Sequence, residues 1–351
     1  MLLIRPSRPE DVGTLVRLAG KAGFGMTNLP PDEGKLSARI DHSTQSFADD
    51  ANHKPDDPTT YFMVLEDTEN RRIVGTSGIY ARIGIKQPFF TYKLITLVQS
   101  SRVLNKSVSS QILQLSNNHI GNTEIGMLFL DPDYRGTGAG RLLGACRYLL
   151  MAQFPDIFAD TVIAEMRGWH DENGISPFWN AIGAHFFEMS FAEADNLSAL
   201  RSNQFISDLM PKHPIYVDLL PGDAQAVIGK PHDETRPALR LLENEGFRYH
   251  GVIDIFDGGP MVEVPRRAIR SIRNSRHATV AVVAPESDMK GKGAKQAIIA
   301  NTDLAGFRCC AGPVLIDGDG VTIGAGCAAA LAVGKGDGLR LLPYGKKGKK
   351  A

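Results

Sequence analysis

The chain has few cysteines, no net charge and no long hydrophobic run. Its 351 residues include four cysteines, and 39 basic residues balance 39 acidic ones. The cysteines show no CxxC spacing, which indicates reduced thiols and gives no reason to expect a metal site or a disulfide framework. The balanced charge provides no global field that would attract nucleic acid or a membrane surface.

The N-terminus also lacks the apolar segment of a signal peptide, and the chain contains no run of about 18 apolar residues. We therefore expect a cytoplasmic protein that binds neither membrane nor nucleic acid. A hydrophobic share of 43% is enough for a sizeable core. The length predicts about two domains.

The hydrophobic pattern predicts a mixed α/β fold, because strands and helices alternate along the first part of the chain. The expected elements are a strand at 2–6, helices after residue 7 and at 32–47, strands at 61–66, 73–79 and 92–104, a strand at 124–130, a helix at 141–154 and a strand at 161–166. Two later units each combine a helix that ends at glycine with a following strand, at 186–189 and at 252–255.

The composition changes at about residue 276, where short apolar runs begin to alternate with glycine and aspartate. Such spacing is typical of short strands joined by tight turns. We predict a main domain over residues 1–275, a small β-rich domain over 276–345 and a basic tail at 346–351.

A glycine-rich segment, RGTGAG at residues 135–140, lies between the predicted central strand and a helix. A pyrophosphate needs several backbone N–H donors directed at one point, and glycines before a helix N-terminus provide them. The spacing does not fit the dinucleotide fingerprint GxGxxG, and no Lys-Ser/Thr follows as in a P-loop. Two interpretations remain, a pyrophosphate site and an ordinary tight turn.

The segment resembles the Q/R-x-x-G-x-G/A motif of the GNAT N-acyltransferases through Arg135, Gly138 and Gly140. Longer segments are similar to the bacterial arginine N-succinyltransferase family: TLV at 96–98, LSNNH at 115–119, AEMRG at 164–168, SPFW at 176–179, LMPKHPIY at 209–216 and IFDGGP at 255–260. The similarity extends from residue 4 to about residue 276.

This resemblance implies a GNAT-like fold with a small, barrel-like C-terminal domain. It also implies transfer of succinyl from succinyl-CoA to the α-amino group of L-arginine, with no cofactor besides the succinyl-CoA co-substrate. Some members of the family act on ornithine, and some assemble from two related subunits. The chain is thus expected to form a homo-oligomer or a hetero-oligomer with a paralogous subunit. The alternatives are an acyltransferase for ornithine or another amine, and a non-catalytic partner subunit.

The resemblance further implies how the acyl donor binds. The backbone N–H of Leu128 corresponds to the family's acyl-CoA contact, although the side chain could equally be an ordinary core leucine. The CoA pyrophosphate is expected on Arg135, Gly136, Gly138 and Gly140, with Arg141 nearby.

Two residues are candidates for proton transfer. His232 corresponds to the family's proton-donor histidine, and a near-neutral pKa would suit that role. The alternative is a surface histidine, one of nine in the chain. Glu124 begins the central strand, where several GNAT enzymes keep a catalytic carboxylate; it could instead be a strand-end glutamate in solvent.

Recognition of arginine requires carboxylates for the guanidinium, and the succinyl carboxylate requires a cation. Glu165, Asp254 and Asp257 are candidates for the first, and Arg167 or Lys212 for the second. The amino acid's own carboxylate could bind Asn117, Asn118 or His119. Each of these residues could alternatively form a structural ion pair.

Overall fold

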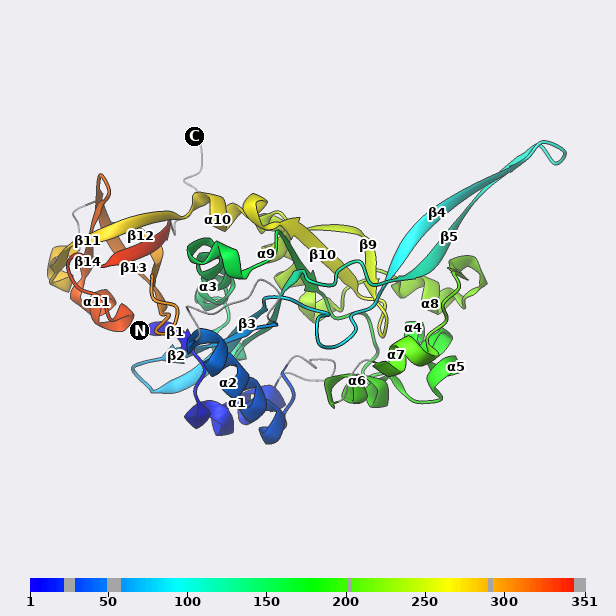
Figure 1. Cartoon of the computed structure of the whole chain (residues 1–351), viewed down its shortest axis with the longest axis horizontal. Coiled ribbons are helices and arrows are strands. Elements are labelled where there is room, and N and C mark those ends of the chain that lie inside the picture. The colour runs from blue at the N-terminus through cyan, green and yellow to red at the C-terminus, as the bar shows by residue number, and fades with distance from the viewer. Residues whose placement is uncertain (22–28, 49–57, 201–203, 290–292, 344–351) are drawn as a thin grey trace.

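A computed structural model of the chain describes residues 1–21, 29–48, 58–200, 204–289 and 293–343. The molecule is elongated, with a barrel at one end and a long hairpin at the other (Figure 1). The strands are β1 (Leu2–Pro6), β2 (Thr60–Asp67), β3 (Arg72–Tyr80), β4 (Thr91–Ser101), β5 (Lys106–Ser116), β6 (Thr123–Leu130), β7 (Thr161–Glu165), β8 (Ile215–Tyr216), β9 (Arg248–Asp254), β10 (Pro260–Pro265), β11 (Arg276–Ala284), β12 (Lys295–Asn301), β13 (Cys309–Asp317), β14 (Gly320–Gly324) and β15 (Gly338–Pro343).

The helices lie on both sides of this layer of strands. They are α1 (Val12–Gly20), α2 (Glu33–Ala48), α3 (Ala139–Gln153), α4 (Pro177–Ala181), α5 (Gly183–Phe187), α6 (Phe191–Leu200), α7 (Gln204–Leu209), α8 (Gly222–Val227), α9 (Arg236–Glu245), α10 (Arg270–Asn274) and α11 (Ala325–Leu331). Within the described ranges, no helix is long and apolar enough to cross a membrane.

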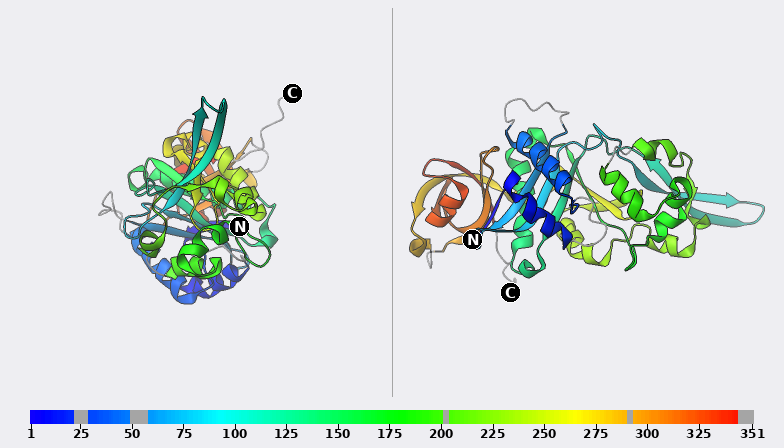
Figure 2. Two further views of the ribbon diagram at one scale, coloured as in Figure 1. Left: turned by 90° about the vertical axis from the view of Figure 1, so that its right-hand side faces the viewer. Right: turned by 90° about the horizontal axis from the view of Figure 1, so that it is seen from below.

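The strands follow the order β12-β15-β11-β14-β13-β1-β2-β3-β6-β7-β10-β9-β4-β5-β8. Most neighbours are antiparallel, and β6 with β7 is a parallel exception in the middle of the sheet. α1 and α2 cover one face of the central strands while α3 covers the other (Figures 1 and 2). The mixed α/β fold predicted from the sequence is confirmed.

The C-terminal strands form a closed barrel, because β12 pairs with β13 as well as with β15. α11 packs against this barrel through Cys327 and Leu331, which are buried with strand residues such as Val321. The predicted β-rich, barrel-like region is therefore present. The exact boundary at residue 275 stays a prediction, and the predicted basic tail at 346–351 lies outside the described residues.

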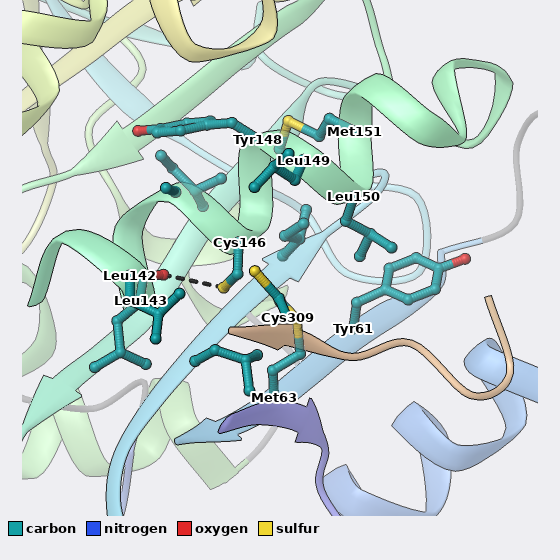
Figure 3. Packing of buried hydrophobic residues seen from close by; sticks show 14 of the residues in the cluster. Tyr61, Met63, Leu142, Leu143, Cys146, Tyr148, Leu149, Leu150, Met151 and Cys309 are labelled. Atoms are coloured by element: carbon teal, nitrogen blue, oxygen red, sulfur yellow. Dashed lines mark hydrogen bonds between the residues drawn. The ribbon is translucent and has the colours of Figure 1, made fainter. Parts of the chain in front are cut away.

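α3 is held by a continuous apolar face. Leu143, Cys146 and Leu150 are buried in the main core with Tyr61 and other residues of β2, and Cys309 of β13 joins them from the barrel side (Figure 3). The Cys146 thiol donates a hydrogen bond to the Leu143 carbonyl oxygen at 3.1 Å. All four cysteines are free and buried. This packing fixes the helix whose N-terminus carries the glycine-rich segment.

β4 and β5 form a hairpin that extends well beyond the rest of the molecule (Figure 1). Its distal part is exposed, with Val98, Val103 and Leu104 at 70%, 94% and 73% accessibility. The base of the hairpin is different, because Tyr92 and Leu113 are buried against the helices α4 to α8. The sequence analysis found a strand at 92–104 but did not predict its partner β5.

The strand predicted at 186–189 is wrong, since these residues belong to α5 and the turn after it. The reason is the packing of Trp179 in α4. A side chain at Gly183 would begin 2.3 Å from the Trp179 ring, so only glycine allows the chain to start a second short helix there. Phe187 then stacks on Trp179 with ring centroids 5.6 Å apart.

Candidate active site

A cavity opens where the two central parallel strands separate. β6 and β7 pair only through Thr123 with Val162 and Glu124 with Ile163. Beyond these pairs, β7 continues alongside β10 while β6 turns away with β3. The opening is part of a cavity of about 1180 Å³ that is also lined by α3 and α9.

A bulge in β6 contributes to this separation. The register with β3 shifts between Thr76 and Gly78, and Met127 has a φ of 53°, in the left-handed region. A bulged strand bends and twists more strongly than a regular one. The Thr76 hydroxyl stabilises the bulge by donating to the Met127 carbonyl oxygen at 2.7 Å. Gly78 lies close beside it, since a Cβ there would meet the terminal methyl of the Met127 side chain at 2.1 Å.

Leu128 follows this bulge and lines the cavity. Neither the ladder with β3 nor the one with β7 includes it. Its side chain packs against the edge of the main core, as an ordinary apolar residue would. That the Leu128 backbone N–H contacts the acyl donor stays a prediction.

The glycine-rich segment forms the turn between β6 and α3. Gly136 and Gly138 have φ values of 79° and 96°, both left-handed. Within the described part of the chain, the amides of residues 136, 137, 138 and 140 donate no hydrogen bond. Successive free N–H groups at a helix N-terminus form a favourable site for an anion.

Basic side chains surround this turn. Arg135 and Arg141 are exposed and line the mouth of the cavity together with Gly140. Thr137 closes the turn by donating from its hydroxyl to the Tyr134 carbonyl oxygen at 2.7 Å. Of the five residues predicted to hold the pyrophosphate, Arg135, Gly140 and Arg141 line the cavity, and Gly136 and Gly138 lie in the turn between Arg135 and Gly140.

Four carboxyl groups line another part of the same cavity. They come from β6, β7, the end of β9 and the β9–β10 connection, and are Glu124, Glu165, Asp254 and Asp257. Asp254 accepts hydrogen bonds from the amides of residues 256 and 257 at 2.7 and 2.9 Å. Asp257 accepts from the amides of Gly168 and Gly259 at 2.6 and 2.8 Å. Backbone donors therefore fix the two aspartates.

The two glutamates have no such partners in the described residues, and their pKa values are high. Burial, followed by repulsion from Asp254, raises the pKa of Glu124 to about 7. Burial and then repulsion from Asp254 and Glu124 raise the pKa of Glu165 well above its ordinary value. Burial likewise raises the pKa of both Asp254 and Asp257. Such a group of carboxyl groups is suited to a cationic ligand.

Arg167 lies next to this group and also lines the cavity. Its Nη2 donates to Oε2 of Glu234 at 2.6 Å and to Nδ1 of His232 at 2.8 Å. The ion pair lowers the pKa of Glu234. Among the described residues, His232 is not one of those that line the cavity, and it contacts the cavity through Arg167.

His232 is held in an uncharged state. Its ring stacks on His170 with centroids 4.7 Å apart. Burial, the nearby Arg167 cation and His170 lower the pKa of His232. Because Nδ1 accepts a hydrogen bond from Arg167, the ring hydrogen is on Nε2. A role as proton donor therefore requires Arg167 to release Nδ1.

The structure does not bring three predicted substrate residues to the cavity. Asn117 is exposed in the turn after β5. His119 is buried in the same turn, with Nε2 3.3 Å from Oε2 of Glu263. Lys212 is exposed in the segment after α7. In the described residues, none of the three lines the cavity.

Sequence reasoning also missed residues that belong to the site. Glu234 and His170 flank His232, and Arg147 lines the cavity from α3. The spacing contained a signal for Arg147, since it follows Gly140 by seven residues and therefore lies about two helical turns along the same face. In the part of the chain that the structure describes, no group of three or more His, Cys, Asp or Glu side chains could hold a metal ion.

Comparisons with known proteins agree over the whole chain. The family model described as arginine N-succinyltransferase beta subunit matches residues 2–271. The model of that subunit's C-terminal domain matches residues 276–343. These two matches together include nearly every residue of the protein.

Individual relatives agree with the family models. The arginine N-succinyltransferase of Enterobacter sp. (strain 638) is 46% identical over 285 residues, which are 81% of this chain and 82% of that protein. The one from Yersinia pseudotuberculosis serotype O:3 (strain YPIII) is 40% identical over 347 residues, 97% of both chains. A solved structure, the arginine/ornithine succinyltransferase subunit AI from Pseudomonas aeruginosa, superposes with a TM-score of 0.88 at 34% identity and covers 99% of each chain. The chain therefore belongs to the arginine N-succinyltransferase family of acyl-CoA-dependent N-acyltransferases.

Proposed function

We propose that this protein transfers the succinyl group of succinyl-CoA to the α-amino group of L-arginine. The observation that carries the proposal is one cavity with two chemically different parts. One part has free backbone donors and arginines that suit a pyrophosphate. The other has four carboxyl groups that suit a guanidinium, two of them buried and two half-buried. The reaction needs no cofactor besides the succinyl-CoA co-substrate.

The acyl donor would bind along β6 and the N-terminus of α3. The pyrophosphate accepts hydrogen bonds from the amides around Gly136, Gly138 and Gly140, with Arg135 and Arg141 supplying charge. The thioester then reaches the bulge, where the Leu128 N–H polarises its carbonyl group. A donor aimed at the developing oxyanion lowers the barrier to acyl transfer.

The acceptor would bind against the carboxyl groups. Asp254, Asp257 and Glu165 pair with the guanidinium, and its positive charge favours their ionised forms. Glu124 takes a proton from the α-ammonium group, because a carboxylate with a pKa of about 7 is a usable base near neutral pH. The freed amine attacks the thioester carbonyl carbon, the new C–N bond forms and the C–S bond breaks.

The succinyl carboxylate would bind Arg167. This contact draws Arg167 away from Nδ1 of His232, which otherwise also accepts from the Glu234 amide. Nδ1 then takes up the second proton that the attacking nitrogen loses, and the resulting imidazolium protonates the departing CoA thiolate. Replacing His232 by glutamine should lower turnover by about 10²-fold. A variant with unchanged turnover would assign the proton to solvent.

The reaction is tested by following CoA release with purified protein, succinyl-CoA and L-arginine. We expect release with this pair, and much weaker release when acetyl-CoA replaces succinyl-CoA. Ornithine and lysine are the informative acceptors, because they offer an ammonium group in place of the guanidinium. No release of CoA at saturating substrates would overturn the proposal.

A second candidate is activity on ornithine or a role as one subunit of a larger enzyme. The printed name of the Pseudomonas aeruginosa protein includes both arginine and ornithine and calls that chain a subunit. Oligomerisation, with itself or with a paralogous chain, and a cytoplasmic location are part of this proposal. A purified chain that is inactive alone and becomes active with a paralogue would favour the partner role.

A further inference from the structure

One buried cation in the cavity has no partner in the mechanism described above. Arg147 lies in α3 at the edge of its apolar face, four residues after Leu143 and three before Leu150. Gly140, Gly144 and Arg147 all line the cavity. They are spaced by four and three residues, so they form one stripe along the helix.

Arg147 is 3% exposed as a whole residue, yet its guanidinium makes few interactions. Its Nε donates to the Gly144 carbonyl oxygen at 3.3 Å, and its central carbon lies 5.7 Å from the centroid of the Tyr148 ring. In the described part of the chain, its terminal nitrogens donate no hydrogen bond and no carboxylate lies within ion-pair distance.

The other buried arginines are different. Arg5 pairs with Asp11 and Glu66 at 2.8 and 2.6 Å. Arg266 donates to the Ala159 carbonyl oxygen at 3.1 Å and pairs with Asp160 at 3.5 Å. A buried charge without a counter-ion is costly, because desolvation is not compensated. Arg147 directs this uncompensated charge into a cavity, which indicates an anionic ligand.

The position of Arg147 relative to the glycine-rich turn indicates which anion it could bind. Arg147 Nε bonds Gly144, so the guanidinium lies one helical turn, about 5.4 Å along the axis, beyond Gly140. Neither Gly140 nor Gly144 has a side chain to fill the space between it and the free amides of the glycine-rich turn. A ligand with two neighbouring anionic groups could therefore contact both.

Coenzyme A has this arrangement, because one ribose carries the pyrophosphate on its 5′ oxygen and a separate phosphate on its 3′ oxygen. The succinyl carboxylate is at the far end of the donor, beyond the thioester at Leu128. We propose that Arg147 binds the 3′-phosphate of the CoA donor and makes the protein select the phosphorylated form. The inference deepens the proposed function and depends on its acyl-CoA half.

The test is calorimetric titration of the full chain with CoA and with 3′-dephospho-CoA. We expect the unmodified protein to bind CoA about 10-fold or more tightly than the dephospho form, as for loss of one charge-assisted contact. Arg147→Gln should weaken CoA binding to the level of the dephospho form and leave the dephospho form unchanged. Arg240→Gln, an exposed arginine of α9 outside the cavity, is the matched control and should retain the discrimination.

Arg147→Lys keeps the charge and covers the case in which the glutamine variant does not fold. It should retain part of the discrimination. Equal affinity of the unmodified protein for both ligands, or an equal loss for both in the Arg147 variants, would overturn the inference. CoA discrimination without succinylation of arginine would contradict the proposed reaction and still support this phosphate site.

Discussion

Four carboxyl groups in one buried space make ionisation the main property of the site at the scale of single residues. Burial raises the pKa of all four groups, which are Glu124, Glu165, Asp254 and Asp257. Repulsion from neighbouring carboxylates raises the pKa of Glu124, Glu165 and Asp257 further. These raised pKa values shift the groups toward their neutral forms when no cation is bound. A bound guanidinium reverses that preference, so substrate binding itself prepares the base.

Glu124 should set the acidic limb of the pH profile. A general base acts only when ionised, so kcat/KM should rise with pH through about 7, the pKa of Glu124, and then level off. Glu124→Gln should lower kcat by about 10²–10⁴-fold and remove this limb. Glu243→Gln, an exposed glutamate of α9 outside the cavity, serves as the control. An active Glu124 variant with an unaltered profile would contradict the assignment.

Glu165 should reduce the stability of the free protein at high pH. Its raised pKa means that the folded state binds more protons than the unfolded state above about pH 4.5, so stability falls as the pH increases. Glu165→Gln removes the buried charge and should stabilise the free protein at pH 8 by on the order of 1–3 kcal/mol, and much less at pH 5.

Urea unfolding at the two pH values measures this difference. L-arginine should stabilise the unmodified protein more than the Glu165 variant. A variant that is less stable than the unmodified protein at pH 8 would show that Glu165 has a stabilising partner in the folded state.

At the scale of elements, the turn between β6 and α3 depends on backbone conformation. Gly138 has a φ of 96°, and alanine in this region costs about 1–2 kcal/mol. We expect Gly138→Ala to lower the melting temperature and to raise the KM for succinyl-CoA by about 10-fold, because the added methyl group changes the direction of neighbouring amides.

Gly13→Ala in α1 provides the comparison. An added methyl group there meets nothing within 4 Å, and the residue is helical. Alanine is expected to be neutral or to stabilise by about 0.5–1 kcal/mol. If both variants bind succinyl-CoA equally well, the glycine-rich turn is structural only.

Some of the secondary-structure elements could be predicted from the sequence, and others could not. The β2–β3 hairpin, β6 and α3 were predicted because each has a strong apolar pattern or a glycine signal. β5 was missed because its serine-rich half, with Ser107, Ser109 and Ser110, lies outside the core and carries no burial pattern. The strand predicted at 186–189 failed because Trp179, not local propensity, determines that segment.

The candidate site likewise contains features that the sequence predicts and features that it does not. The glycine-rich turn could be predicted because it is contiguous, and Glu165, Asp254 and Asp257 were named from their charge. Their convergence with Glu124 could not be predicted, since it depends on how β6, β7 and β9 come together. Asn117 and His119 belong to the family segment at 115–119, but membership of a segment does not determine the direction in which its side chains point.

At the scale of the whole molecule, the barrel and the main sheet share one core. Phe307 and Ile298 of the barrel region are buried in the same cluster as Leu143 and Tyr61. Phe307→Ala should therefore destabilise the entire protein, by about 3–5 kcal/mol. Calorimetry should show a single unfolding transition, and the substitution should lower its midpoint temperature. Two transitions, with only one shifted, would show that the barrel unfolds independently.

β1 has a consequence for how the molecule forms. This strand pairs with β2 on one side, and on the other Leu3 pairs with Cys310 and Ile4 with Cys309 of β13. β1 therefore obtains this second partner only when β13, far later in the chain, is available to pair. Such a contact between distant parts of the chain is slow to form. Until it does, the open edge of β1 can pair with other chains, so this edge is a site where aggregation can begin during folding.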